Sequence, residues 1–139
     1  MKTTVITWLR RLALLALIAP ALALADPYRV VIQVSDNDPA KWSLALNNAR
    51  NIVADLGEGN AEIEIVAYGP GIHMLKAESS VAPRIEEALK GHTKVMACEN
   101  TMRGQKLVPA DMIPAVGYVP SGVVELVKRQ KEGWAYLRP

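Results

Sequence analysis

Apolar residues follow two different spacings along the chain, and the two spacings alternate. Short runs rich in valine and isoleucine, apolar at consecutive positions, are typical of strands that are covered on both faces. Between these runs, apolar residues return at intervals of three and four, as on the buried face of a helix. The pattern predicts strands at residues 29–34, 62–67, 93–98, 116–119 and 134–137, and helical segments at 39–56, 80–90, 100–107, 109–113 and 121–131.

The residues that border these segments support the assignment. Asp38 can cap the first helix, with Pro39 in its first position and Gly57 after its end. Ser80 and Ser121 are expected to begin two later helices in the same way. Strands separated by helices of this length predict a parallel sheet with helices on both faces. We therefore predict an α/β fold around a mostly parallel sheet of about five strands.

The first 25 residues have a different pattern, that of a secretory signal. Three basic residues and no acid precede an apolar stretch, residues 12–25, whose last three residues are Ala-Leu-Ala, a small-residue cleavage pattern. The alternative is a membrane anchor, but this stretch is shorter than the roughly 20 residues that span a bilayer. We expect cleavage after Ala25, a single domain at residues 26–139, a periplasmic location and no membrane attachment after cleavage.

The charge balance changes once the expected signal is set apart. The 139 residues are 50% hydrophobic, and 16 Lys and Arg oppose 14 Asp and Glu, which gives a formal charge of +2. Three of the basic residues lie in the signal, so residues 26–139 carry a formal charge of −1. That balance argues against a nucleic-acid partner. A single cysteine also excludes an intramolecular disulfide and a zinc site built on several thiolates.

We expect the functional residues to lie where the strands end, because ligands of open α/β sheets bind outside the carboxyl ends of the strands. Cys98 stands there, between the third strand and the next helix. A thiol near a helix N-terminus can have its pKa lowered from about 8.5 to roughly 3.5–7.5, which supplies a thiolate nucleophile. Arg103 would add positive charge, whereas Glu99 would oppose ionisation. The alternative is that Cys98 packs as a small buried hydrophobe.

Two further residues of this edge are candidates. His73 could approach Cys98 as a base, although its apolar neighbours favour a structural histidine in a short helical turn that packs inward. Asp36 is a candidate for binding, but turn formation also explains an aspartate at its position. The loop around Asp36 lacks the glycine spacing of a nucleotide site, so we expect no cofactor, and two aspartates without further ligands do not predict a metal.

At this point the residues resemble a known family. The segments Val30–Asp36, Asn47–Asn51, Val66–Gly71, Ala97–Met102 and Gly133–Pro139 are similar to the exported branch of the DsrE/DsrF-like family. The resemblance implies a three-layer α/β/α sandwich around a parallel sheet, and assembly as a trimer or hexamer. It also implies sulfur carried as a persulfide on a cysteine at this edge, a role that falls on Cys98 alone.

Two hypotheses from different classes follow. In the first, the protein is a periplasmic sulfur carrier whose Cys98 thiolate accepts sulfane sulfur and passes it on between donor and acceptor proteins. Asn100 and Thr101 would then stabilise the anion. In the second, the protein is a noncatalytic oligomeric binding protein in which Cys98 is buried as a packing residue. Thiol oxidoreduction is a weaker third hypothesis, because the chain has no second cysteine for a C-x-x-C cycle.

Overall fold

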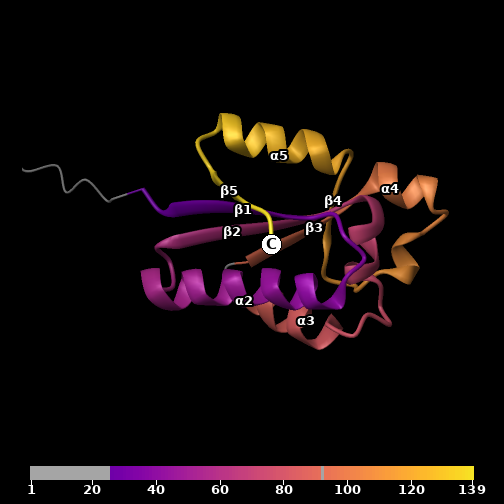
Figure 1. The fold of residues 1–139 in the computed structure, drawn as a ribbon, viewed down its shortest axis with the longest axis horizontal. Helices are drawn as coiled ribbons and strands as arrows, with labels where there is room; N and C mark the ends of the chain where they lie inside the picture. The colour runs from indigo at the N-terminus through magenta and orange to yellow at the C-terminus, as the bar shows by residue number, and fades with distance from the viewer. Residues whose placement is uncertain (1–25, 92) are drawn as a thin grey trace, which may run out of the picture.

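The computed structural model describes residues 26–91 and 93–139 (Figure 1). The expected signal, residues 1–25, and His92 lie outside the described residues. The elements, in chain order, are β1 (Tyr28–Val34), α2 (Pro39–Leu56), β2 (Ala61–Ala67), the 3-10 helix η1 (Gly69–Leu75), α3 (Ala82–Lys90), β3 (Thr93–Cys98), α4 (Glu99–Gly104), the 3-10 helix η2 (Pro109–Asp111), β4 (Gly117–Val119), α5 (Gly122–Lys131) and β5 (Ala135–Leu137). Each of the five predicted strands is present.

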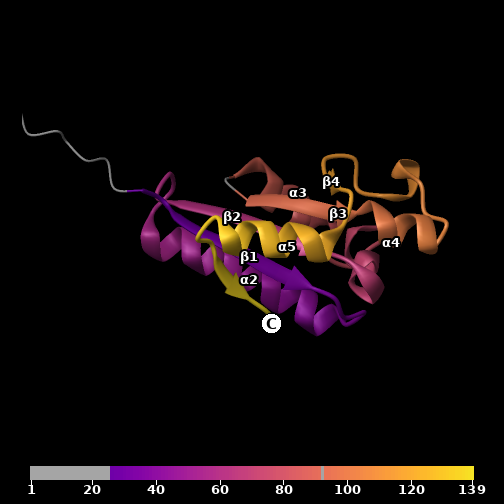
Figure 2. The same cartoon turned by 90° about the horizontal axis from the view of Figure 1, so that it is seen from above.

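The sheet has the order β4-β3-β2-β1-β5, and all four strand pairs are parallel. Val30 lies opposite Ile63, and Ile63 lies opposite Thr93, so the three central strands are nearly in line. Helices α2 and α3 cover one face of the sheet, and α5 runs along the other face (Figures 1 and 2). The predicted α/β fold, with helices on both faces of the sheet, is confirmed.

The two faces of the sheet differ in how much apolar surface they bury. The face under α2 and α3 carries the larger core, in which Ile32, Ile63 and Ile65 meet Trp42 and Ile85. The face under α5 has a small apolar cluster consisting of Val31, Val66, Leu126 and Trp134, with Tyr68 and Met96 packed against it. Hydrophobic burial therefore holds α5 less firmly than it holds α2.

Helix ends are where the structure departs from the prediction. Asp38 caps α2 as expected, since its Oδ1 accepts the N–H of Ala40 at 2.8 Å. Helix α3, however, begins at Ala82 instead of Ser80, because residues 79–82 form a separate turn closed by a 3.0 Å bond from Ala82 N to Ser79 O. Ser121 does precede α5, but its side chain forms no capping hydrogen bond.

In the described ranges, no helix combines the length and apolar character required to cross a bilayer.

Candidate functional site

The carboxyl edge of the sheet is closed by two short helices, η1 and α4. The chain leaves β2 through Tyr68, whose N–H donates to Val34 O at 3.1 Å, and turns at once into η1. Gly71 makes this turn possible, because a Cβ atom there would lie 2.3 Å from the carbonyl oxygen of Val34. The Tyr-Gly-Pro-Gly sequence therefore lets η1 lie directly against the end of β1.

Helix α4 is tied to η1 by side chains of its own. The Thr101 hydroxyl accepts the N–H of Gly69 at 2.9 Å. The Gln105 side chain donates to the carbonyl of the same glycine at 3.2 Å. These two bonds hold α4, and with it the end of β3, against the loop that follows β2.

Cys98 lies at the centre of this arrangement. It is the last residue of β3 and the N-cap of α4, and its Sγ accepts the N–H of Thr101 at an N-to-S distance of 3.4 Å. The Thr101 hydroxyl and the backbone N–H groups of Gly122 and Asn100 also favour the ionised sulfur, although the Asn100 N–H donates to the carbonyl of Pro120 at 3.2 Å. The residue is 4% exposed. The sulfur is thus enclosed by donors.

The donor from Gly122 comes from the first turn of α5. The first N–H groups of a helix have no partner inside the helix, and the Ser121 side chain supplies none here. The Gly122 N–H group lies near the Cys98 sulfur and favours its ionised form. Glycine is needed at this position because an added Cβ would lie 2.9 Å from the Cβ of Tyr68. The start of α5 therefore packs between Tyr68 and the thiol.

These contacts determine the ionisation of Cys98. Burial opposes the thiolate, but the hydrogen bonds from the Thr101 hydroxyl and from the backbone N–H groups of Gly122, Thr101 and Asn100 outweigh it. The pKa of the Cys98 thiol therefore lies below its ordinary value of 9.0. The arrangement favours a thiolate, which is the nucleophilic form of cysteine.

Of the other candidate residues on α4, some lie near the Cys98 sulfur and others lie on the outer surface of the helix. The N–H of Thr101 donates to the sulfur, whereas the N–H of Asn100 donates to the carbonyl of Pro120 at 3.2 Å. The Asn100 side chain instead accepts a hydrogen bond from Arg103, and both residues are exposed. Arg103 thus lies on the outer surface of α4 and binds Asn100.

In the described part of the chain, neither His73 nor Asp36 forms a hydrogen bond with the thiol. His73 is half-buried in η1, between the buried Ile72 and Met74, and among the described residues it forms no hydrogen bond with Cys98. The expected short helical turn is therefore present. Asp36 follows β1, two strands away from β3, where it pairs with Lys41 at 3.0 Å and Arg138 at 3.6 Å. Its side-chain hydrogen bond with Lys41 outweighs desolvation and lowers the pKa of this carboxyl group.

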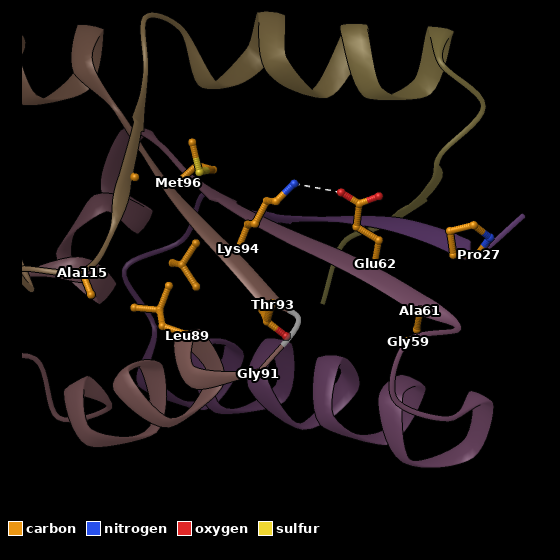
Figure 3. A pocket seen from close by; sticks show the side chains of 12 residues that line it. Pro27, Gly59, Ala61, Glu62, Leu89, Gly91, Thr93, Lys94, Met96 and Ala115 are labelled. Atoms are coloured by element: carbon orange, nitrogen blue, oxygen red, sulfur yellow. Dashed lines mark hydrogen bonds and ion pairs between the residues drawn. The ribbon is translucent and has the colours of Figure 1, made fainter.

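Two cavities among the described residues lie away from Cys98. One, of about 570 Å³, runs beside the amino-terminal half of β3, where Leu89, Thr93, Lys94 and Met96 line it (Figure 3). The second, of about 420 Å³, lies between α2 and α3. Neither cavity is lined by a residue that contacts the Cys98 sulfur. The described residues contain no group of three or more His, Cys, Asp and Glu side chains that could hold a metal ion.

One donor at the thiol is not found by reading the sequence. The sequence predicts Gly122 only as part of the helix at residues 121–131, since its place beside Cys98 depends on how α5 crosses the sheet. A glycine immediately after a helix-capping serine, at the carboxyl edge, is the signal that could have pointed to it.

The fold and the site together define a class: a parallel α/β sandwich with a donor-enclosed thiol where an inner strand ends. Comparison with known families narrows this class. The sequence model of the DsrE/DsrF-like family matches residues 28–139. The chain therefore belongs to the DsrE/DsrF-like family, and membership suggests a role related to sulfur relay.

Solved structures agree with this assignment. A protein of unknown function from Methanobacterium thermoautotrophicum is 38% identical, with a TM-score of 0.77, over 81% of this chain and 99% of that one. The ychN protein from E. coli is 13% identical with a TM-score of 0.64, over 83% of this chain and 100% of that one. A conserved protein of unknown function from Bacteroides thetaiotaomicron is 15% identical with a TM-score of 0.61, over 80% and 94% of the two chains. The last two support the fold alone. A comparison with curated proteins gave no match.

Proposed function

We propose that this protein is a periplasmic sulfur carrier in which Cys98 holds sulfane sulfur as a persulfide. The observation that carries the proposal is the set of donors around the Cys98 sulfur, which lowers the pKa of the thiol. Membership of the DsrE/DsrF-like family adds the association with sulfur relay.

The chemistry needs two exchange steps. In the first, the Cys98 thiolate attacks the outer sulfur of a donor persulfide, R–S–SH. A new S–S bond forms to Cys98, the donor S–S bond breaks, and the donor leaves as the thiolate R–S⁻. In the second, an acceptor thiolate attacks the outer sulfur of the Cys98 persulfide, and Cys98 leaves as a thiolate. Neither step requires an added oxidant or reductant.

The donors around Cys98 suit its part as a leaving group. When sulfur passes to the acceptor, negative charge returns to the Cys98 sulfur. The N–H group of Thr101 already donates to that atom, and the Thr101 hydroxyl and the Gly122 N–H group also favour its ionised form. Donors placed where charge develops stabilise the transition state without reorganisation, and low-pKa thiols leave faster.

Mass spectrometry of the intact protein tests the proposal. After treatment with polysulfide and removal of excess reagent, the protein is expected to gain the mass of one sulfur atom. Dithiothreitol should reverse the gain, and Cys98→Ser should not show it. Because Cys98 is the single cysteine, the adduct needs no further assignment. A folded wild-type protein that takes up no sulfur contradicts the proposal.

A second candidate function is favoured by the 4% exposure of Cys98. In this alternative the protein is a noncatalytic oligomeric binding protein, and the thiol only packs against the end of α5. The two functions differ in how Cys98 reacts with an alkylating agent. A sulfur carrier reacts in its native state, whereas a packing residue reacts only after the protein is unfolded.

The periplasmic location is supported by the basic and apolar pattern of residues 1–25. Expression of the whole chain in a bacterium, followed by osmotic release of the periplasm, tests it. The released protein is expected to begin at Asp26. A full-length chain that remains in the cytoplasm contradicts this part of the proposal.

Assembly as a trimer or hexamer is supported by the family resemblance and by apolar side chains on the surface. Helix α5 exposes three valines, Val123, Val124 and Val127. Valine has a low helix propensity, so helix formation does not explain these exposed apolar side chains. Light scattering after size-exclusion chromatography is expected to give a multiple of the chain mass. A monomer at all concentrations contradicts the assembly.

A further inference from the structure

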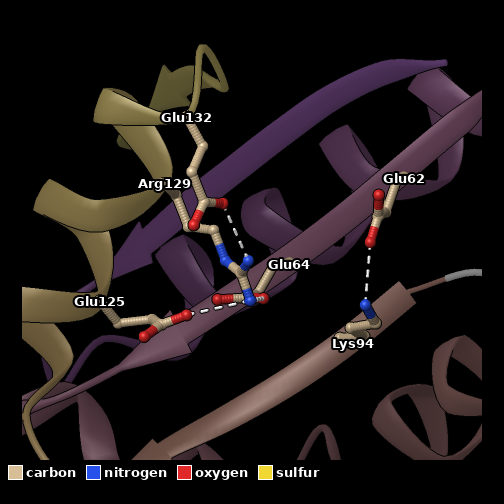
Figure 4. A network of polar contacts seen from close by, with 6 residues as sticks. All are labelled: Glu62, Glu64, Lys94, Glu125, Arg129 and Glu132. Atoms are coloured by element: carbon tan, nitrogen blue, oxygen red, sulfur yellow. Dashed lines mark hydrogen bonds and ion pairs between the residues drawn. The ribbon is translucent and has the colours of Figure 1, made fainter. Parts of the chain in front are cut away.

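A buried ionic cluster lies under α5, at the opposite end of that helix from the thiol. Glu64, in the middle of β2, has no exposed surface, and its Oε2 receives Arg129 of α5 at 2.7 Å (Figure 4). Arg129 also contacts Glu125 at 3.0 Å and Glu132 at 3.1 Å. Its guanidinium carbon lies 4.8 Å from the centre of the Trp134 ring. One arginine thus joins α5, the turn after it and the central sheet.

Some buried polar atoms of this ionic cluster lack hydrogen bonds, which argues against a purely stabilising role. Among the described residues, three buried atoms have no hydrogen-bond partner, namely Glu64 Oε1, Arg129 Nε and Trp134 Nε1. A buried ion pair is commonly no more stable than well-packed apolar residues of the same volume, and its best-attested use is to fix the register of one element on another. A role in positioning α5 therefore explains the cluster better than a gain in stability.

Helix α5 needs such a device because few apolar contacts hold it. Its apolar cluster with the sheet contains four buried residues, of which Leu126 is the only one on the helix itself. Sliding of α5 along the sheet would move Gly122, its first residue, away from the Cys98 sulfur.

We propose that the Glu64–Arg129 ion pair positions the Cys98 site, because it fixes α5 along the sheet and thereby holds the Gly122 N–H group against the sulfur. Glu64 and Arg129 are positioning residues and do not touch the thiol. Glu64 lies opposite Lys94 in the sheet, and Cys98 is four residues further along β3, roughly 13 Å away at 3.3 Å per residue. The inference rests on the proposed role of Cys98 as a reactive thiol.

The test measures the pKa of Cys98 from the ultraviolet absorbance of its thiolate, as a difference from Cys98→Ser. This readout works even for a thiol that reagents do not reach. In Glu64→Gln the side-chain shape is kept and the charge is lost. If the pair positions α5, the pKa of Cys98 rises by about half a unit to one unit, because the Gly122 donor is lost or lengthened. The direct effect of removing a negative charge has the opposite sign, because it favours the thiolate.

Glu62→Gln is the matched control. Glu62 lies two residues earlier on the same face of β2 and is also paired, with Lys94 at 2.8 Å, but it does not contact α5 through Arg129 (Figure 4). Its substitution is expected to leave the pKa of Cys98 unchanged.

A second variant covers the case in which Glu64→Gln does not fold. Glu64→Leu combined with Arg129→Met replaces the pair by apolar side chains and leaves the net charge unchanged, and such replacements commonly preserve folding. It is also expected to raise the pKa of Cys98. A folded variant of either kind whose Cys98 pKa equals the wild-type value, or lies below it, overturns the inference. Because no sulfur donor is used, this result is independent of whether Cys98 carries a persulfide.

Discussion

At the scale of single residues, the behaviour of Cys98 depends on the balance between burial and hydrogen bonding. Burial alone would raise the pKa of the thiol, as for a cysteine that only packs. The Thr101 hydroxyl contributes the largest opposing effect, and backbone N–H groups add to it. The residue type matters because the Thr101 hydroxyl both accepts from Gly69 and acts as a donor toward Cys98, whereas an apolar side chain of the same shape could do neither.

Replacement of Thr101 by valine tests this balance. Valine keeps the shape of the side chain but neither accepts from Gly69 nor donates to the sulfur. We expect Thr101→Val to raise the pKa of Cys98 by about one unit, measured by thiolate absorbance against pH. Thr93→Val, the same change at the other end of β3, is the control and should leave the pKa of Cys98 unchanged. An unchanged pKa in Thr101→Val would show that the hydroxyl does not control the thiol.

Gly122 gives a second prediction at this scale. An alanine there would place its Cβ 2.9 Å from Tyr68 Cβ, so the start of α5 must move away from Tyr68. We expect Gly122→Ala to lower the free energy of unfolding by about 1–3 kcal/mol, measured in urea, and to raise the pKa of Cys98. Gly104→Ala, at a glycine with open space around its Cβ position, should change the stability by less than about 0.5 kcal/mol. Equal stability of the two variants would contradict the close packing at Gly122.

At the scale of elements, the site is made by short segments that meet where the long ones end. Strand β3 supplies the thiol, η1 and α4 close over the carboxyl edge, and α5 brings its first N–H group from the far side of the sheet. The most crowded of these junctions is between η1 and β1, where Gly71 faces the backbone of Val34 and Ser35.

Substitution of Gly71 tests the junction between η1 and β1. A Cβ atom 2.3 Å from a backbone carbonyl oxygen cannot be relieved by rotation of a side chain, so η1 must move as a unit. We expect Gly71→Ala to reduce the free energy of unfolding by at least about 3 kcal/mol, measured in urea against Gly104→Ala. A loss below about 0.5 kcal/mol would mean that η1 is not held where the structure places it.

How far the sequence predicts these elements depends on what creates each one. The long helix α2 and the strands follow from periodicity and from the cap at Asp38, because both are local properties. The start of α3 cannot be predicted in this way. Two serines precede Pro83, and the turn at residues 79–82 begins at the first of them, so the helix begins only at Ala82. The place of Cys98 follows from its position at a strand end. Its neighbour Gly122 lies 24 residues away in sequence and arrives only through the crossover of α5.

At the scale of the whole molecule, the sheet has one strongly packed face and one that combines a small apolar cluster with charged residues. The ionic cluster of Glu64 and Arg129 lies on the second face. Burial raises the pKa of Glu64 above its ordinary value of 4.5, although the hydrogen bond from Arg129 opposes the shift. The face with the small apolar cluster is also the face along which α5 runs, and the start of α5 lies near the thiol.

The raised pKa of Glu64 predicts how stability depends on pH. The folded protein binds this proton more tightly than the unfolded chain does, so the contribution of Glu64 to stability is largest at low pH. It is lost as pH rises from 4.5 through the folded-state pKa. In urea unfolding, the stability of Glu64→Gln relative to wild type should therefore increase from acidic to neutral pH. A relative stability that stays constant or decreases over this interval would contradict the raised pKa.

The proposed function requires that hydrogen-bond donors lower the pKa of Cys98 and that this thiol reacts in the folded protein. The most direct measurement is the rate at which iodoacetamide alkylates Cys98 in the native protein as a function of pH, with Cys98→Ser as the blank. We expect measurable alkylation of the folded protein, with a midpoint at lower pH than that of the urea-unfolded protein. A midpoint equal to or above that of the unfolded protein, or alkylation that occurs only after unfolding, would contradict this expectation.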